Sequence, residues 1–536
     1  MRFLVLVATG LLFGAAQAAE LRQPVPDAHA LTNVRIVTEP GRVIESGSIV
    51  IRNGLIEAVG ARITIPDDAR VHVFDREEGQ DPITIYPGLI EPYLVVEIED
   101  DEEDKETPTG RHPLIHPDRR LGARHWPEDA VEGLRRSGFT TALMVPGDGL
   151  LRGQGLIANL GADGLSHNLL NPRFAQVASL EARGEQRQFP GSLMGAVALL
   201  RQTLADAQWQ VQARAAWQRN PAQARPQWLE GLDDLAPMIG GTTPLIFASQ
   251  DLLDTLRILE LIEPGDIDLV LVGHGEEYRR LQALADRRVT HILPLNFPEA
   301  PDVKGENDRN ASLEQLRHWH RAPDNPKLLA EADIPMLFTT HGLSRPGEIF
   351  EQLVKAVERG LDPDRALAAM TTDPARWLGL QDRAGRIGPG LMANLVVVEG
   401  ELLAESPSIN EVWIDGKRHV LAALEPPGVD PAGTWALTLG LGGMGDVDAS
   451  LVLSGPPTGM EGSLTVMGNE TPLTDVRVSG ERVIVTIDAS RFGGSGTISI
   501  RLDIDGDRAR GSGSGPFGEF TIRGRRTGGP DEEEAS

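Results

Sequence analysis

The chain has 536 residues and contains no cysteine, and its 78 Asp and Glu residues outnumber its 51 Lys and Arg residues, which gives a formal charge of −27. The absence of cysteine excludes disulfides, cysteine-ligated zinc, iron–sulfur clusters and thiol nucleophiles. The acidic balance argues against nucleic acid or an anionic membrane surface as the main partner. At ~150 residues per domain, this length predicts three or four domains.

The N-terminus has the pattern of a secretory signal peptide. Arg2 precedes a short apolar run over residues 3–13, and Ala16-Gln17-Ala18 offers a cleavage site. The apolar run is shorter than the ~20 residues that a bilayer-spanning helix needs. We therefore expect a mature chain that starts near Ala19, a periplasmic or secreted bacterial protein, and no integral membrane segment after cleavage.

Short strands come next, and an alternation of helices and strands follows. Residues 31–66 contain three β-rich segments, and Asn53-Gly54 predicts a two-residue hairpin turn between two of them. From residue 127 to residue 371, helical segments alternate with short, continuously apolar strands. This alternation is typical of a parallel sheet that is buried on both faces, as in an open α/β fold or a barrel.

The C-terminal quarter has a different character. A stretch rich in Pro and Gly at 426–433 has the composition of a linker, and residues 434–526 form strand-like segments separated by Gly-rich turns at about ten-residue spacing. This pattern predicts a small β-barrel or sandwich. The Gly, Pro and acidic tail that follows is predicted to be disordered.

Four segments resemble the amidohydrolase superfamily, in particular a secreted, imidazolonepropionase-like branch: residues 85–91 (IYPGLIE), 138–142 (GFTTA), 360–380 and 385–397. With the strand-rich stretches on both sides of them, the resemblance covers about residues 31–423, in the order expected for that family. The resemblance implies an α/β fold in which a (β/α)8 TIM-like barrel carries a small composite β-sandwich built from both chain ends, with the C-terminal all-β domain added. The expected domains are a signal peptide (1–18), a composite sandwich (19–85 and 383–424), a barrel (86–382), a linker (425–433), a C-terminal β-barrel or sandwich (434–526) and an acidic tail (527–536).

The resemblance also implies hydrolysis of C–N bonds by one or two divalent metals, yet most ligand positions are replaced. The first barrel strand of the family ends in His-x-His, and the matching positions here are Tyr93 and Val95. The fifth-strand histidine is replaced by Phe247. His274 matches the sixth-strand histidine, and His341 stands where the family has an aspartate. The usual binuclear site is therefore not supported.

Three interpretations of His274 and His341 remain open at this point. The two imidazoles, with His274 as the ligand retained from the family, could bind one divalent metal such as zinc. They could instead act as acid and base without a metal, because an imidazole titrates near neutral pH. The third interpretation assigns them no chemistry. Arg152 and Asp148, in a Gly-rich turn after the second strand, are candidates for substrate binding, since an arginine can hold a carboxylate in a bidentate manner.

Other polar groups near the expected barrel mouth are weaker candidates. His112, His116 and His125 lie in the loop after the first barrel strand, but the prolines among them break any regular spacing, which favours solvated loop residues over a metal site. The acidic run 97–106 favours a solvated loop over a calcium site because it lacks the spacing of a calcium loop. His318 and His320, two residues apart on a predicted helix, are expected at the surface.

Two functions from different classes follow. The first is a divergent periplasmic hydrolase acting on small amides, cyclic amides or peptide-like substrates, with His341 and His274 as catalytic residues and Arg152 and Asp148 binding the substrate. The second is a catalytically inactive scaffold that binds a protein partner or forms a homo-oligomer, with the C-terminal domain as the interaction module.

Overall fold

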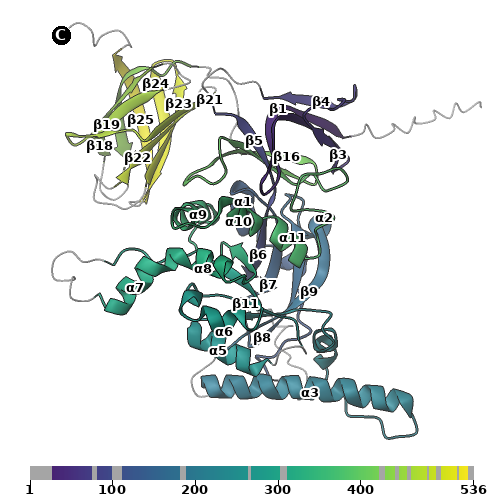
Figure 1. The fold of residues 1–536 in the computed structure, drawn as a ribbon. Coiled ribbons are helices and arrows are strands. Elements are labelled where there is room, and N and C mark those ends of the chain that lie inside the picture. Colours follow the sequence, from purple (N-terminus) through teal and green to yellow (C-terminus); the bar gives the residue numbers. More distant parts are fainter. Residues whose placement is uncertain are drawn as a thin grey trace, which may run out of the picture.

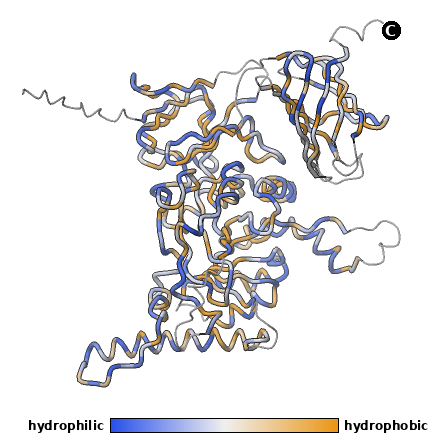
Figure 2. The backbone as a smooth tube through the Cα atoms, turned by 180° about the vertical axis from the view of Figure 1, so that it is seen from behind, coloured by the Kyte–Doolittle hydropathy of each residue, from blue (hydrophilic) through white to orange (hydrophobic). Residues whose placement is uncertain are grey.

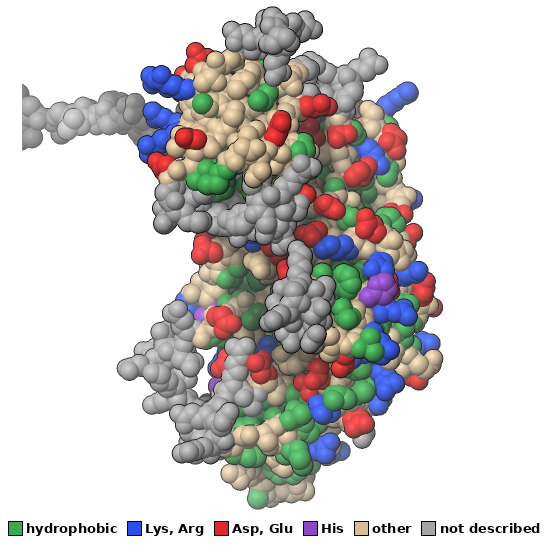
Figure 3. All heavy atoms as spheres, turned by 90° about the vertical axis from the view of Figure 1, so that its left-hand side faces the viewer, with side chains coloured by type: hydrophobic (Ala, Val, Ile, Leu, Met, Phe, Trp, Pro, Cys, Tyr) green, Lys and Arg blue, Asp and Glu red, His purple; other side chains and the backbone are tan. Residues whose placement is uncertain are grey.

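The structure is a computed structural model that describes residues 27–74, 81–98, 112–181, 189–262, 267–301, 311–421, 429–440, 446–455, 460–479, 482–489, 497–515 and 518–528. The predicted signal peptide, most of the acidic run 97–106, residues 425–428 of the linker and the tail after Gly528 lie outside the described residues. Basic and acidic side chains are interspersed over the face shown in Figure 3. Among the described residues, no helix is both long and apolar enough to cross a membrane.

Strands from both ends of the chain form one sheet, in the order β16-β15-β14-β5-β1-β2-β3, with β4 paired to β1. The antiparallel pair of β5 and β14 joins the two halves. Asn53 and Gly54 both have positive φ in the turn between β2 and β3, where the sequence predicts a hairpin. The strands are β1 (Ala28–Glu39), β2 (Arg42–Arg52), β3 (Leu55–Gly60), β4 (Arg70–Val73), β5 (Ile83–Pro87), β14 (Leu395–Glu399), β15 (Ser408–Ile414) and β16 (Lys417–Val420).

The second sheet is an eight-stranded, nearly closed barrel in chain order from β6 to β13, which confirms the predicted fold class. The strands are β6 (Leu89–Val96), β7 (Phe139–Pro146), β8 (Leu151–Asn159), β9 (Leu169–Ser179), β10 (Leu245–Ala248), β11 (Leu269–Val272), β12 (Thr290–Pro294) and β13 (Met336–Thr339). One feature departs from a regular (β/α)8 barrel. β8 pairs antiparallel with both β7 and β9, and only a short turn separates it from β7.

Helices cover the outside of the barrel and one of its ends. They are α1 (Glu128–Arg136), α2 (Leu165–Asn168), α3 (Leu193–Arg219), α4 (Ala236–Ile239), α5 (Leu252–Leu261), α6 (Leu281–Ala285), α7 (Leu313–Arg321), α8 (Asn325–Glu331), α9 (Ile349–Glu358), α10 (Pro363–Ala368) and α11 (Thr372–Trp377), with short 3-10 turns that include η3 (Leu232–Leu235) and η4 (Glu277–Arg279). Figure 1 shows α3 at the end of the barrel opposite to the chain-end sheet. Because β6 runs away from that sheet, the carboxyl ends of the parallel strands face this end.

The C-terminal domain is a nine-stranded antiparallel sheet in the order β20-β19-β18-β17-β25-β24-β23-β22-β21, with β20 also close to β22. The strands are β17 (Gly433–Gly440), β18 (Asp446–Ser454), β19 (Glu461–Val466), β20 (Asn469–Pro472), β21 (Asp475–Ser479), β22 (Arg482–Asp488), β23 (Thr497–Asp505), β24 (Arg508–Gly515) and β25 (Gly518–Gly528). Hydrophobic and hydrophilic residues alternate along these strands (Figure 2), so one face forms a separate core around Trp435. The guanidinium of Arg526 lies 4.8 Å from the Trp435 ring and donates to the carbonyl of Ala432.

Candidate functional site

The reversed direction of β8 determines which side chains lie at the barrel mouth. The beginning of β8, rather than its end, lies beside the carboxyl ends of the other strands, and this places Arg152 there. The sequence places Arg152 and Gln154 in a Gly-rich turn, but both lie on this strand, so the predicted turn is wrong. The first half of β8 has left β7 and pairs instead with the loop before α1, through Ile115 and Arg120.

Arg152, Tyr93 and His341 form a cluster at the mouth. Nη1 of Arg152 donates a hydrogen bond of 3.1 Å to the hydroxyl of Tyr93. The Tyr93 ring in turn packs edge-to-face against the imidazole of His341, with 5.2 Å between ring centroids. Tyr93 is 2% exposed and Arg152 is 7% exposed. Nε of Arg152 is buried and has no hydrogen-bond partner among the described residues.

The electrostatics of this cluster follow from burial and from one fixed cation. Burial raises the pKa of the Tyr93 hydroxyl, while Arg152 opposes this shift and the negative charge of Glu181 adds to it. His341 lies at the rim with part of its surface exposed. The protein around its ring, and secondarily the charge of Arg152, lower the pKa of His341. The cluster therefore combines a neutral phenol, a neutral imidazole and a guanidinium at pH 7.

Glu91, on β6, holds Tyr93 and His341 in place. One carboxylate oxygen accepts hydrogen bonds from the backbone N–H of Tyr93 and the hydroxyl of Thr339, and the other accepts two bonds of 2.8 Å from the N–H and hydroxyl of Thr340. The Thr339 hydroxyl then accepts a bond from the N–H of His341. Glu91 is completely buried, and burial raises its pKa against the effect of these donors. It thus joins β6 to β13 where the barrel closes.

Glu91 belongs to the segment that carries the family resemblance, but sequence analysis assigned it no role. Its position just before Pro92 is the available signal. The ladder between β6 and β7 is irregular between Glu91 and Leu94. A proline in a strand interior removes a ladder hydrogen bond and marks such bulges.

Among the described residues, no contact joins His274 to the cluster of Arg152, Tyr93 and His341, so the two predicted catalytic histidines are not in contact. The backbone N–H of His274 donates to Oε1 of Glu277, and its Nε2 lies 3.8 Å from the same oxygen. Asn325 donates to the other carboxylate oxygen, at 2.7 Å. Burial opposes ionisation of Glu277, yet the imidazoles of His274 and His291 and the backbone donors lower its pKa. Nε2 of His274 has no hydrogen-bond partner among the described residues.

The remaining predicted groups have structural partners or lie elsewhere. Asp148 contributes its backbone carbonyl, which accepts a bond from Arg119, and not a side chain directed at Arg152. His112 bonds the carbonyl of Phe189, whereas His125 accepts from the N–H of Gly122. His318 is not a free surface residue, because it stacks on Tyr278. His112 and His125 thus pack in the loop before α1, and His318 of α7 packs on η4.

A buried amide network ties the loop before α1 and η3 to the same end of the barrel. The side-chain amides of Gln154 and Gln176 both donate to the carbonyl of Pro117, at 3.1 and 2.9 Å. Gln154 also donates to the carboxylate of Asp234, which accepts a further bond from Arg120. Sequence analysis did not identify this network, since its members come from four separate segments.

The cluster of Arg152, Tyr93 and His341 does not fit a metal. A guanidinium has no lone pair to donate, and its permanent charge repels a cation. Tyr93 and Phe247 stand where the resemblance implies imidazoles, and Nε2 of His274 lies 3.8 Å from Oε1 of Glu277. Within the described part of the chain, no group of three or more His, Asp or Glu side chains is arranged to hold a metal ion. The single-metal site at His274 therefore stays a prediction.

Comparisons with known proteins agree with the fold. Residues 321–419 match the family described as the Amidohydrolase family. The structure is similar to an amidohydrolase from Thermotoga maritima MSB8, with a TM-score of 0.58 and 18% identity over 73% of this chain and 98% of that one.

Local sequence similarity extends to two curated relatives. The chain is 45% identical over 64 residues to an adenine deaminase of Methanopyrus kandleri, which is 12% of this chain and 10% of that protein. It is 26% identical over 155 residues to amidohydrolase tasK of Hapsidospora irregularis, 27% of this chain and 15% of that one. The chain thus spans only a small part of the length of these relatives.

Proposed function

We propose that the barrel mouth of this chain, whose residues 321–419 match the Amidohydrolase family and whose barrel resembles that of an amidohydrolase, binds a small molecule with a carboxylate or an amide carbonyl without using a metal. One observation carries the proposal: the buried guanidinium of Arg152, whose Nε lacks a partner among the described residues, lies beside the Tyr93 hydroxyl. An arginine in a water-poor environment favours a negatively charged or strongly polar oxygen. In this proposal Arg152 supplies the fixed positive charge that a metal supplies in the family.

A binding experiment tests this proposal. We expect an N-acetyl amino acid, which has both a carboxylate and an amide carbonyl, to bind in calorimetry with unchanged affinity in the presence of EDTA. Arg152→Met is expected to weaken binding about tenfold or more, since a lost charge-assisted hydrogen bond is worth ~1.5–3 kcal/mol. Arg173→Met is the matched control because Arg173 is exposed on β9 and does not contact the cluster.

Arg152→Lys provides a second variant that keeps the charge but loses the planar fork. An intermediate affinity is expected for it. Binding that needs added metal, or that survives Arg152→Met in a folded protein, would contradict the proposal. Metal analysis of protein purified without chelator gives an independent measurement, and we expect less than ~0.1 equivalent of zinc, manganese or iron, because true sites bind near stoichiometrically.

Metal-free hydrolysis of a C–N bond is the second candidate, and the lowered pKa of His341 favours it. A neutral imidazole can accept a proton from a water that attacks the carbonyl and can return it to the leaving amine. Arg152 and Tyr93 would donate hydrogen bonds to the carbonyl oxygen as it gains negative charge. Amine release from a panel of small amides, abolished by His341→Gln, would support this candidate. If ligands bind but no amine is released, the site binds small molecules without hydrolysing them.

The inactive-scaffold alternative assigns the C-terminal domain to a protein partner or to self-association. Light scattering on the full chain measures self-association directly. The proposed periplasmic or secreted location has its own test, since N-terminal sequencing of the exported protein should give Ala19 as the first residue.

A further inference from the structure

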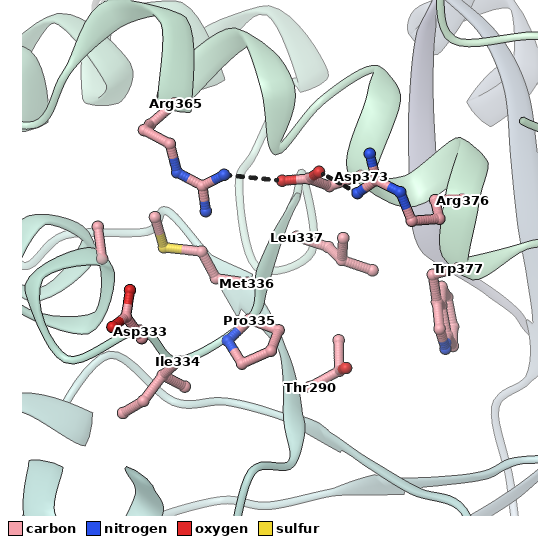
Figure 4. Close-up of a pocket in the computed structure, with 11 residues that line it drawn as sticks. Thr290, Asp333, Ile334, Pro335, Met336, Leu337, Arg365, Asp373, Arg376 and Trp377 are labelled. Atoms are coloured by element: carbon pink, nitrogen blue, oxygen red, sulfur yellow. Dashed lines mark hydrogen bonds and ion pairs between the residues drawn. The ribbon is translucent and has the colours of Figure 1, made fainter.

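A cavity lies at the opposite end of the barrel from Arg152, and its floor is apolar. It has a volume of about 690 Å³ and opens beside the amino ends of β12 and β13. Met336 and Leu337, at the start of β13, form part of its lining together with Trp377 of α11 (Figure 4). Trp377 is held in place by an edge-to-face contact with Phe174, at 5.2 Å between ring centroids. The cavity is therefore large enough for a small organic molecule and offers it an aromatic wall.

Three charged side chains line the side of the cavity that α10 and α11 provide. Asp373 accepts a hydrogen bond of 2.8 Å from Arg376 and a longer one of 3.4 Å from Arg365 (Figure 4). One carboxylate is thus shared by two guanidiniums, and this wall carries a net positive charge. Nε and Nη2 of Arg365 make no hydrogen bond within the described part of the chain. These donors are available to a further anion.

We propose that this cavity binds a small monoanion with a flat, apolar body. The anionic group would take the free donors of Arg365, while the apolar body would lie on the exposed Pro335 against Trp377. The apolar contact is needed because the side chains of Arg365 and Arg376 are 46% and 69% exposed, and an exposed ion pair alone contributes little. Asp333 lines the same cavity and disfavours ligands with more negative charge.

This site is independent of the function proposed for the barrel mouth. Its residues come from the amino ends of β12 and β13, the loop before β13, α8, α10 and α11, and none of them belongs to the cluster of Arg152, Tyr93 and His341. A ligand could therefore bind at either end without the other. Failure at one site leaves the proposal for the other unaffected.

The experiment compares two probes of the same shape, 2-naphthoate and 2-naphthamide, with the full-length protein. They share the flat bicyclic body and differ in charge. We expect 2-naphthoate to bind in calorimetry at least tenfold more tightly than 2-naphthamide. Arg365→Met should remove this preference. Arg345→Met is the same change in the loop after β13, at a side chain that is 82% exposed, and it should not remove the preference.

Two more variants test the geometry. Asp373→Asn removes the carboxylate that competes for the guanidiniums, so we expect it to tighten naphthoate binding severalfold. Thr290→Trp places a large side chain in the cavity and should abolish the binding of both probes in a protein that keeps its circular dichroism spectrum. Equal binding of the two probes, or naphthoate binding unchanged in both Arg365→Met and Thr290→Trp, would overturn the proposal, and so would the absence of naphthoate binding at millimolar concentration.

Discussion

At the scale of the residue, the carboxylate of Glu91 connects the strands β6 and β13. All of its described partners are donors, and they come from Tyr93 on β6 and from Thr339 and Thr340 at the end of β13. An amide in this position would direct an N–H₂ group at donors. We expect Glu91→Gln to lower the free energy of unfolding by about 1–3 kcal/mol. Denaturant unfolding measures this, with Glu45→Gln, whose side chain is 80% exposed, as the matched control.

The effect of Glu91 on stability should depend on pH. Burial raises the pKa of this carboxyl in the folded chain above its ordinary value of about 4.3. A group that takes up a proton on folding contributes stability that is present below the unfolded pKa and is lost as pH rises through the folded pKa. The stability difference between wild type and Glu91→Gln should therefore be largest at acidic pH and shrink as pH rises. A difference that grows with pH would mean that the four donors outweigh burial.

His341 offers a second test at this scale. Burial, and then the charge of Arg152, lower the pKa of its imidazole. Removal of the charge in Arg152→Met should raise the pKa of His341 toward its ordinary value of about 6.5. Titration of labelled histidine by NMR measures this shift. Arg173→Met should leave the titration of His341 unchanged. An unchanged titration in Arg152→Met would show that the charge of Arg152 does not affect the pKa of His341.

At the scale of the element, the pairing of β8 with the loop before α1 depends on Gly153. Its φ is +117°, and an added Cβ would lie 2.7 Å from the carbonyl oxygen of Arg119. We expect Gly153→Ala to lower stability by about 2–3 kcal/mol through backbone strain and displacement of the loop. Hydrogen exchange of the Gln154 amide, which donates to Arg119, should accelerate. Gly390→Ala is the control, because Gly390 has a positive φ of +83° but open space around it, and should cost only about 1 kcal/mol.

The same strand shows where sequence reasoning reached its limit. Periodicity and turn residues located most strands, including the hairpin at Asn53 and Gly54, because these signals are local. The direction of β8 is not a local property, so Arg152 was assigned to a turn. Arg152 is hydrogen-bonded to Tyr93, which lies 59 residues away in the chain, and no local pattern in the sequence predicts such a pair.

The role of His274 stays a prediction, and its surroundings show a related limit. Its imidazole accepts a hydrogen bond at Nδ1 from the N–H of Glu276, and its backbone N–H donates to Glu277, which is fully buried and bonded to Asn325, 48 residues further on. A motif match gives the position of a side chain along a strand. It does not give the hydrogen bonds that the residue then makes with groups brought close by the fold.

At the scale of the whole molecule, the described chain has separate cores that should unfold separately. The core of the C-terminal domain is made only of residues between Ala432 and Ile522, and the others belong to the barrel and the chain-end sheet. Calorimetry should show two transitions. Trp435→Ala should lower only one of them and Trp413→Ala only the other, since each fully buried tryptophan lies in one core and such truncations cost about 3–5 kcal/mol. A single transition shifted by both variants would show that the parts unfold together.

The reversed strand also has a consequence for the order of folding. Parallel strands come together only after long connections close, and such non-local contacts form slowly. β7, β8 and β9 instead form a meander whose antiparallel partners are close in the chain, such as Met144 and Leu156. We expect this meander to assemble early and to serve as the template onto which the later strands add. The segment that carries Arg152 would then be among the first parts of the barrel to gain protection in pulsed hydrogen exchange during refolding.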